Sequence, residues 1–89
     1  MLQAALSGNK EAVELLISKG ADVNARNKYG ETALMYAARS GNKETVEFLI
    51  NKGLDVNAKA NDGLTALKVA ISNHDEEMVD LLKRYGAKE

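Results

Sequence analysis

Residue types that catalyse reactions or bind transition metals are rare in this sequence of 89 residues. Its one histidine, His74, has no cysteine and no second histidine with which to form a zinc site or a nucleophilic triad. The phosphate-binding motifs G-x-x-x-x-G-K-S/T and G-x-G-x-x-G are also missing. We therefore expect His74 to be a turn residue, and we expect neither catalysis nor a cofactor.

Two pairs of side chains carry the oxygen ligands that calcium prefers. Each pair is an aspartate and an asparagine separated by one valine, Asp22 with Asn24 and Asp55 with Asn57. Neither continues into the other ligands of a calcium loop, so we predict hydrogen bonds within a turn rather than a metal site. The acidic run at residues 75–77 opens an expected helix, where the helix dipole favours negative charge.

Length and charge exclude several other classes of protein. A chain of 89 residues forms one domain, and its formal charge of -1 gives no overall attraction to nucleic acid or to an anionic membrane. It has no run of eighteen apolar residues, its first twenty residues lack the basic start and apolar middle of a signal peptide, and without cysteine it is suited to a reducing compartment. We expect an intracellular, cytoplasmic protein that binds neither nucleic acid nor membranes.

The sequence repeats itself at a fixed interval. Gly20, Gly53 and Gly86 mark a 33-residue period, and residues 1–26 match residues 34–59 at 17 positions. The chain then holds about two and two-thirds units. We divide it into a partial N-terminal unit (1–26), a full unit (27–59) and a C-terminal capping unit (60–89).

Each unit contains the signals for two short helices. In the middle unit Thr32 can cap a first helix over residues 33–40, which Gly41 ends by taking a left-handed conformation. Asn42 can cap a second helix over residues 43–52. The segments from Asp22 to Gly30 and from Asp55 to Gly63 are rich in turn residues, so we expect each to project as a hairpin-like loop.

The second helix has one apolar face. Val46, Leu49 and Ile50 lie on a single stripe at helical spacing, and the opposite face is charged. Helices of about ten residues are marginal alone, so each pair must cover its stripe by packing against its neighbours. The sequence therefore predicts an all-α stack of helix pairs.

The repeat resembles the ankyrin-repeat family over essentially the whole chain. The positions that carry the resemblance are Gly30, Thr32-Ala33-Leu34, Ala37-Ala38, Gly41-Asn42, Val46, Leu49-Ile50, Gly53 and Asp55-Val56-Asn57-Ala58, with their copies one period away. The resemblance implies an all-α solenoid of antiparallel helix pairs with β-hairpin finger loops. It also implies a concave face that binds other proteins and performs no catalysis.

The sequence departs from the family pattern in three places. The usual Thr-Pro-Leu-His reads Thr-Ala-Leu-Met at residues 32–35 and Thr-Ala-Leu-Lys at residues 65–68, which weakens the helix starts. His74 stands where the earlier units have glycine, so the third turn is either strained or rearranged. Leu54 replaces the alanine of the other units and either fills an interface or is exposed.

By resemblance, the partner-binding positions are the finger tips and the exposed side of each first helix. These are Leu6, Ser7, Arg26, Lys28, Tyr29, Glu31, Arg39, Ser40, Lys59, Asn61, Asp62, Leu64, Lys68, Ser72 and Asn73. Tyr29 is the most informative, because tyrosine is enriched at binding hot spots. Its alternative role is to pack on the neighbouring finger. Leu64 is a weaker apolar candidate.

Charge differs between the two sides of the array. The binding positions carry five positive and two negative groups, a sum of +3, whereas the second helices carry six positive and eight negative, a sum of -2. We predict a protein partner with an acidic surface. The alternative is that the basic residues merely keep the fingers solvated.

The two ends of the chain differ from the middle. Lys83, Arg84 and Tyr85 give the last unit a polar outer face, typical of a terminal cap. Leu2 and Leu6 can be exposed on the incomplete first unit. Either the sequence begins inside a longer array, or this edge self-associates and gives the protein a structural, scaffold role. We expect a monomer in the first case.

Overall fold

In the computed structural model, residues 10–20 and 22–88 can be described. They form five helices, α2 (Lys10–Ser18), α3 (Ala33–Ser40), α4 (Lys43–Asn51), α5 (Ala66–Ser72) and α6 (Glu76–Arg84), with turns but no strand between them. The expected all-α repeat fold is confirmed. The expectations for Leu2, Leu6 and Ser7 lie outside the described residues.

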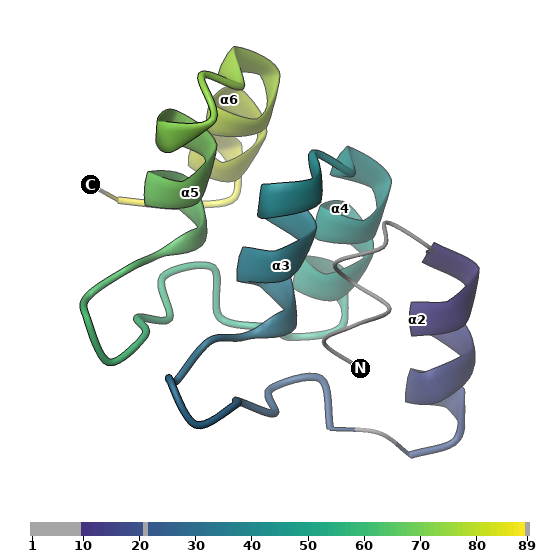
Figure 1. Cartoon of the computed structure of the whole chain (residues 1–89). Coiled ribbons are helices and arrows are strands. Elements are labelled where there is room, and N and C mark those ends of the chain that lie inside the picture. The colour runs from purple at the N-terminus through teal and green to yellow at the C-terminus, as the bar shows by residue number, and fades with distance from the viewer. Residues whose placement is uncertain (1–9, 21, 89) are drawn as a thin grey trace.

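The helices pack as repeated pairs. Helix α3 packs against α4, α5 against α6, and the two pairs meet through α3 and α5, while α2 packs against α4 (Figure 1). The loops after α2 and α4 both project from the same end of the helices (Figure 1). The stack therefore places two loops from different units next to one another.

Side-chain caps start three of the helices. At the start of α4, Asn42 Oδ1 accepts from the Thr45 N–H at 3.0 Å. Thr65 Oγ1 accepts from the Lys68 N–H at the start of α5, and Asp75 Oδ1 accepts from the Met78 N–H at the start of α6, both at 3.2 Å. Thr32 precedes α3 as predicted, but its hydroxyl makes no capping bond, and within the described part of the chain Thr32 Oγ1 is buried without a hydrogen-bond partner. Helix α4 ends at Asn51, one residue before the expected end.

Every described helix contributes to one core. Val13, Leu34, Leu49, Leu67 and Leu82 come from five different helices and are all fully buried. None of these short helices could shield its apolar face alone. The packing confirms that the fold depends on contacts between units.

The apolar stripe of α4 faces this core as predicted. Val46 and Leu49 are fully buried, and Ile50 is half-buried against the cluster. Leu54 is only 4% exposed and belongs to the same cluster, so its larger side chain fills an interface. At the other end of the stack, Lys83 and Arg84 are exposed.

The turn at His74 is strained but not rearranged. His74 has a φ of 57°, and Gly41, at the equivalent position of the middle unit, has a φ of 77°. Asp75 N–H donates to Ala70 O at 3.0 Å, just as Asn42 N–H donates to Ala37 O at 3.2 Å. The histidine therefore adopts the left-handed conformation that glycine takes more easily.

The β-hairpin form of the fingers is not confirmed. We define the first finger as residues 22–32 and the second as residues 55–65. Asn27 N–H donates to Glu31 O at 3.2 Å, but the N–H of Glu31 returns to the Asn27 side chain at 3.0 Å. Since a side-chain oxygen replaces a backbone carbonyl, the ladder of a hairpin does not develop in this finger.

Candidate partner-binding surface

The tip of the first finger is organised by Asn27. Its Oδ1 accepts hydrogen bonds from the N–H groups of Tyr29 and Glu31, at 2.9 and 3.0 Å. The N–H of Gly30 donates to the Asn27 carbonyl at 2.9 Å. One asparagine thus closes the turn that carries Tyr29, and the predicted site did not include it.

The two fingers are bonded to each other. Arg26 Nη1 donates to the Lys59 carbonyl at 2.8 Å, a contact between residues 33 apart in the sequence. In the other direction, the Asn61 N–H donates to the Tyr29 carbonyl at 2.9 Å and Asn61 Nδ2 donates to the Lys28 carbonyl at 3.1 Å. Arg26 and Asn61 were predicted to contact a partner, and the structure also gives them this role between the fingers.

The ring of Tyr29 is exposed at the finger tip. The residue is 59% exposed, and the Lys28 ammonium lies 5.2 Å from the centre of its ring. Its described hydrogen bond to the neighbouring finger involves only the backbone, where the Tyr29 carbonyl accepts from the Asn61 N–H. More than half of the Tyr29 surface is therefore accessible, and the Lys28 ammonium, which has no ion pair among the described residues, lies over one face of the ring.

Four side chains form a polar network between the first finger and α3. Asn27 Nδ2 donates to Glu31 Oε1 at 2.8 Å and to the Tyr36 hydroxyl at 3.0 Å, and that hydroxyl lies 3.2 Å from Glu31 Oε1. Arg39 pairs with Glu31 Oε2 at 3.3 Å and lies 5.2 Å from the centre of the Tyr36 ring. The network holds the finger against the helix.

This network stabilises the charged form of Glu31. The hydrogen bond from Asn27, followed by those from Arg39 and Tyr36, lowers the pKa of Glu31 below its ordinary value, against an opposing effect of burial. Glu31 and Arg39 largely neutralise one another. Tyr36 and Asn27 were missing from the predicted site because half-buried polar residues do not differ in sequence from core or turn residues.

The other predicted positions vary in how accessible they are. Ser40, Asp62, Ser72 and Asn73 are exposed, although Asp62 Oδ1 accepts from the Leu64 N–H and Asn73 Nδ2 donates to the Arg39 carbonyl. Leu64 is half-buried and packs against the core, so little of its apolar surface is left for a partner.

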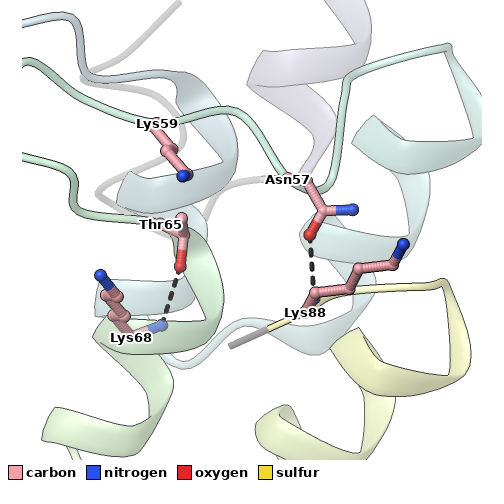
Figure 2. Close-up of a pocket in the computed structure, with 5 residues that line it drawn as sticks. All are labelled: Asn57, Lys59, Thr65, Lys68 and Lys88. Atoms are coloured by element: carbon pink, nitrogen blue, oxygen red, sulfur yellow. Dashed lines mark hydrogen bonds between the residues drawn. The ribbon is translucent and has the colours of Figure 1, made fainter.

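A hollow of about 480 Å³ lies between the second finger, α5 and the C-terminal segment (Figure 2). It is lined by Asn57, Lys59, Thr65, Lys68 and Lys88. Lys59 and Lys68 belong to the predicted site, and the other three do not. The 33-residue period places Lys88 in register with Asp55, where a lysine was a detectable departure from the repeat.

The acidic residues of the turns have structural roles. Asp22 Oδ1 and Asp55 Oδ1 each accept a hydrogen bond from the N–H two residues later, at 2.9 Å in both units. This confirms the prediction of turn hydrogen bonds. Asp75 caps α6, and Glu77 pairs with Lys43 at 3.2 Å.

Within residues 10–20 and 22–88, no helix is both long and apolar enough to cross a membrane.

Comparison with known proteins supports the repeat assignment. The family description "Ankyrin repeats (3 copies)" matches residues 1–89. The chain is similar to a protein of Acanthamoeba polyphaga mimivirus named as an ankyrin repeat protein, at 70% identity over 27 residues (30% of this chain, 17% of the relative). It is also similar to an E3 ubiquitin-protein ligase of Arabidopsis thaliana, at 59% identity over 34 residues (38% of this chain, 7% of the relative).

A third relative is the mitochondrial disaggregase of Homo sapiens, which is 51% identical over 37 residues (42% of this chain, 5% of the relative). The matched segment thus makes up less than a fifth of each of these three relatives. The similarity therefore concerns the repeat and not the other parts of those proteins.

Proposed function

Because the chain belongs to the ankyrin-repeat family, whose repeats are generally protein-interaction modules, we propose that it is a non-enzymatic module that binds a protein partner through its two fingers and the exposed side of α3 and α5. The observation that carries the proposal is Tyr29, 59% exposed at the tip of a finger that is bonded to its neighbour. A large aromatic side chain in such a position is the kind of group that anchors a partner.

The charges around Tyr29 favour a partner with acidic character. Lys28, Lys59 and Lys68 are exposed, and no ion pair to them occurs in the described residues, whereas the charge of Arg39 is balanced by Glu31. Exposed positive charges speed the encounter with an acidic surface, and salt screens them. Association should then slow as the salt concentration rises.

Affinity capture with matched variants tests the proposal. The chain, its Tyr29→Ala variant and its Tyr85→Ala variant are immobilised, and captured proteins are quantified by mass spectrometry. Tyr85 is a suitable control because it is also an exposed tyrosine, at 39%, and it follows α6 instead of lying at a finger tip. We expect proteins held by the original chain and by Tyr85→Ala to be lost from Tyr29→Ala. Equal capture by all three chains would contradict the proposal.

Self-association is the second candidate, and Leu15 favours it. Leu15 lies on α2, the first described helix, and is 55% exposed. Under this proposal the N-terminal edge joins two copies in a structural, scaffold role. The molar mass measured by light scattering would rise with concentration, and Leu2→Ser with Leu6→Ser would abolish the rise. If the measured molar mass remains that of a monomer at high concentration, self-association is excluded.

For either role we propose a cytoplasmic location, which suits a chain without cysteine.

A further inference from the structure

We propose that the lysine hollow, the depression lined by Asn57, Lys59, Thr65, Lys68 and Lys88, receives the carboxylates of an acidic peptide segment of the partner. This inference rests on the proposed function, since it assigns a location and a chemistry to the acidic part of the partner. It adds Lys88, which lies outside the finger and helix positions considered above.

The hollow concentrates positive charge. Three of its five lining residues are lysines, the other two are uncharged, and none is a carboxylate. All three lysines are exposed. Three lysines without a carboxylate among the lining residues give the hollow a positive potential, which attracts an incoming carboxylate.

The backbone around each lysine is held in place. Lys88 N–H donates to Asn57 Oδ1 at 2.9 Å, and Lys68 N–H donates to Thr65 Oγ1 at 3.2 Å (Figure 2). The Lys59 carbonyl accepts from Arg26 at 2.8 Å. Asn57 Nδ2 also donates to the Gly86 carbonyl at 3.1 Å, which fixes the C-terminal segment beside the hollow.

Among the described residues, the ammonium groups have few partners. Figure 2 shows the Lys59 ammonium directed toward Thr65, while the Lys68 and Lys88 side chains extend toward opposite sides of the view. Lys68 Nζ donates to the Gly63 carbonyl at 3.3 Å, a neutral acceptor that leaves its charge uncompensated. An incoming carboxylate can therefore pair with these amines without first breaking an ion pair among the described residues.

The preceding unit does not repeat this arrangement. The positions one period before the three lysines are Arg26, Met35 and Asp55, whose charges sum to zero. Met35 is fully buried, whereas Lys68 is exposed. A helix pair stacked here in the same register would have to cover Lys68, and burying an unpaired ammonium is costly. The charge therefore favours an anionic peptide over a second copy of this chain.

The size of the hollow limits what it can receive. A lysine ammonium is a compact charge with rotatable donors that pairs with carboxylate or phosphate oxygens, and an acidic peptide supplies carboxylates. A volume of about 480 Å³ lies within the range of ligand pockets and admits a few side chains but no folded element. We therefore assign it to two or three neighbouring aspartates or glutamates.

Fluorescence anisotropy with defined peptides tests this assignment. The probes are fluorescein-labelled hexaglutamate, hexaglutamine, and a hexapeptide in which phosphoserine alternates with glycine, each at low and high salt. The variant Lys59→Gln/Lys68→Gln/Lys88→Gln removes the charge of the hollow. Its control, Lys19→Gln/Lys52→Gln/Lys83→Gln, makes the same change in net charge at exposed positions on or just after the second helices.

We expect hexaglutamate to bind at low salt and hexaglutamine not to bind. The hollow variant should lose roughly ten-fold in affinity, since three exposed ion pairs of about 0.5 kcal/mol each are removed, and the control should change by less than about two-fold. Circular dichroism should show both variants folded. Amide NMR shifts on adding hexaglutamate should be largest at Lys59, Lys68 and Lys88.

Three results would overturn the assignment. Equal losses in the two variants would indicate only overall charge, and equal binding of hexaglutamine would exclude the carboxylates. Tighter binding of the phosphoserine peptide than of hexaglutamate would point to phosphate instead. If any of these results occurs while affinity capture of partner proteins still depends on Tyr29, the proposed function stands and only the assignment of the hollow to carboxylates is wrong. Loss of that dependence would remove the proposed function itself.

Discussion

Gly30 in the first finger lies against Asn61 in the second so closely that a Cβ atom on Gly30 would be 2.7 Å from Asn61 Oδ1 and 3.0 Å from Asn61 N. Gly30 also has a φ of 77°, which disfavours any side chain. The equivalent Gly63 has a φ of 86° and open space around it. The glycine of the first finger is thus required by packing as well as by backbone conformation.

We expect Gly30→Ala to lower the free energy of unfolding by about 2 kcal/mol and Gly63→Ala by about 1 kcal/mol, because only the first substitution adds a clash to the unfavourable backbone angle. Urea denaturation measures both. Amide hydrogen exchange at Asn61 should become faster in Gly30→Ala, as its bond to Tyr29 O opens. Equal losses in the two variants would show that the fingers do not pack as described.

His74→Gly should stabilise the protein. The left-handed conformation of His74 costs a non-glycine residue about 1–2 kcal/mol, only part of which is cancelled by the greater freedom of glycine in the unfolded chain. We expect a gain of about 1 kcal/mol by urea denaturation. Gly41→Ala is the reverse control and should lose about 1 kcal/mol, since its Cβ would meet only Asp75 Oδ2 at an ordinary 3.7 Å. A loss of stability in His74→Gly would mean that the imidazole has a structural role.

The two threonines before α3 and α5 should respond differently to valine. Thr65 Oγ1 caps α5, so Thr65→Val should lower the free energy of unfolding by about 1 kcal/mol. Thr32 is 1% exposed and its hydroxyl is unpaired within the described residues, so Thr32→Val removes a buried polar atom and keeps the shape. Its stability should be unchanged or up to about 1 kcal/mol higher. Thermal unfolding of the two variants measures the difference. If Thr32→Val were less stable than Thr65→Val, the expected difference between the two hydroxyl groups would be wrong.

Stability should decrease at acidic pH partly through Glu31. The pKa of Glu31 is lower in the folded chain than its ordinary value of 4.5. The ionised carboxylate therefore contributes fully to the free energy of unfolding above pH 4.5, and this contribution is lost as the pH falls through the lowered pKa of the folded state. Glu31→Gln should therefore be less stable than the original chain at pH 7, and the difference should shrink as the pH falls below 4.5. Urea denaturation across this range gives the comparison. A difference independent of pH would assign the effect to shape and not to charge.

The sequence predicts local structure well in this protein because the signals are local. Gly41 ends α3 and Asn42 caps α4 through contacts within a few residues, and the 33-residue period places the same signals in the next unit. The helix stripe of Val46 and Leu49 follows from the period of an α-helix. Three local features differ: α4 ends one residue earlier than expected, Thr32 makes no capping bond, and the β-hairpin form of the fingers is not confirmed.

The arrangement of the candidate surface was harder to predict. Arg26 and Asn61 donate to backbone carbonyls of another unit, and a carbonyl is the same whatever residue carries it, so the sequence gives no sign of these bonds. Leu64 resembles an exposed anchor in the sequence but packs against the core. Lys88 joins the hollow because Asn57 binds its backbone, a contact between residues 31 apart.

The bonds between the fingers affect how a partner would be bound. Loops that move independently lose conformational entropy when a ligand orders them, and this loss weakens binding. Here Arg26 and Asn61 bridge the loops in the free chain, so much of that ordering accompanies folding. If the fingers bind a partner as proposed, this ordering lowers the entropic cost of binding, and we expect a substitution in one finger to affect binding at the other.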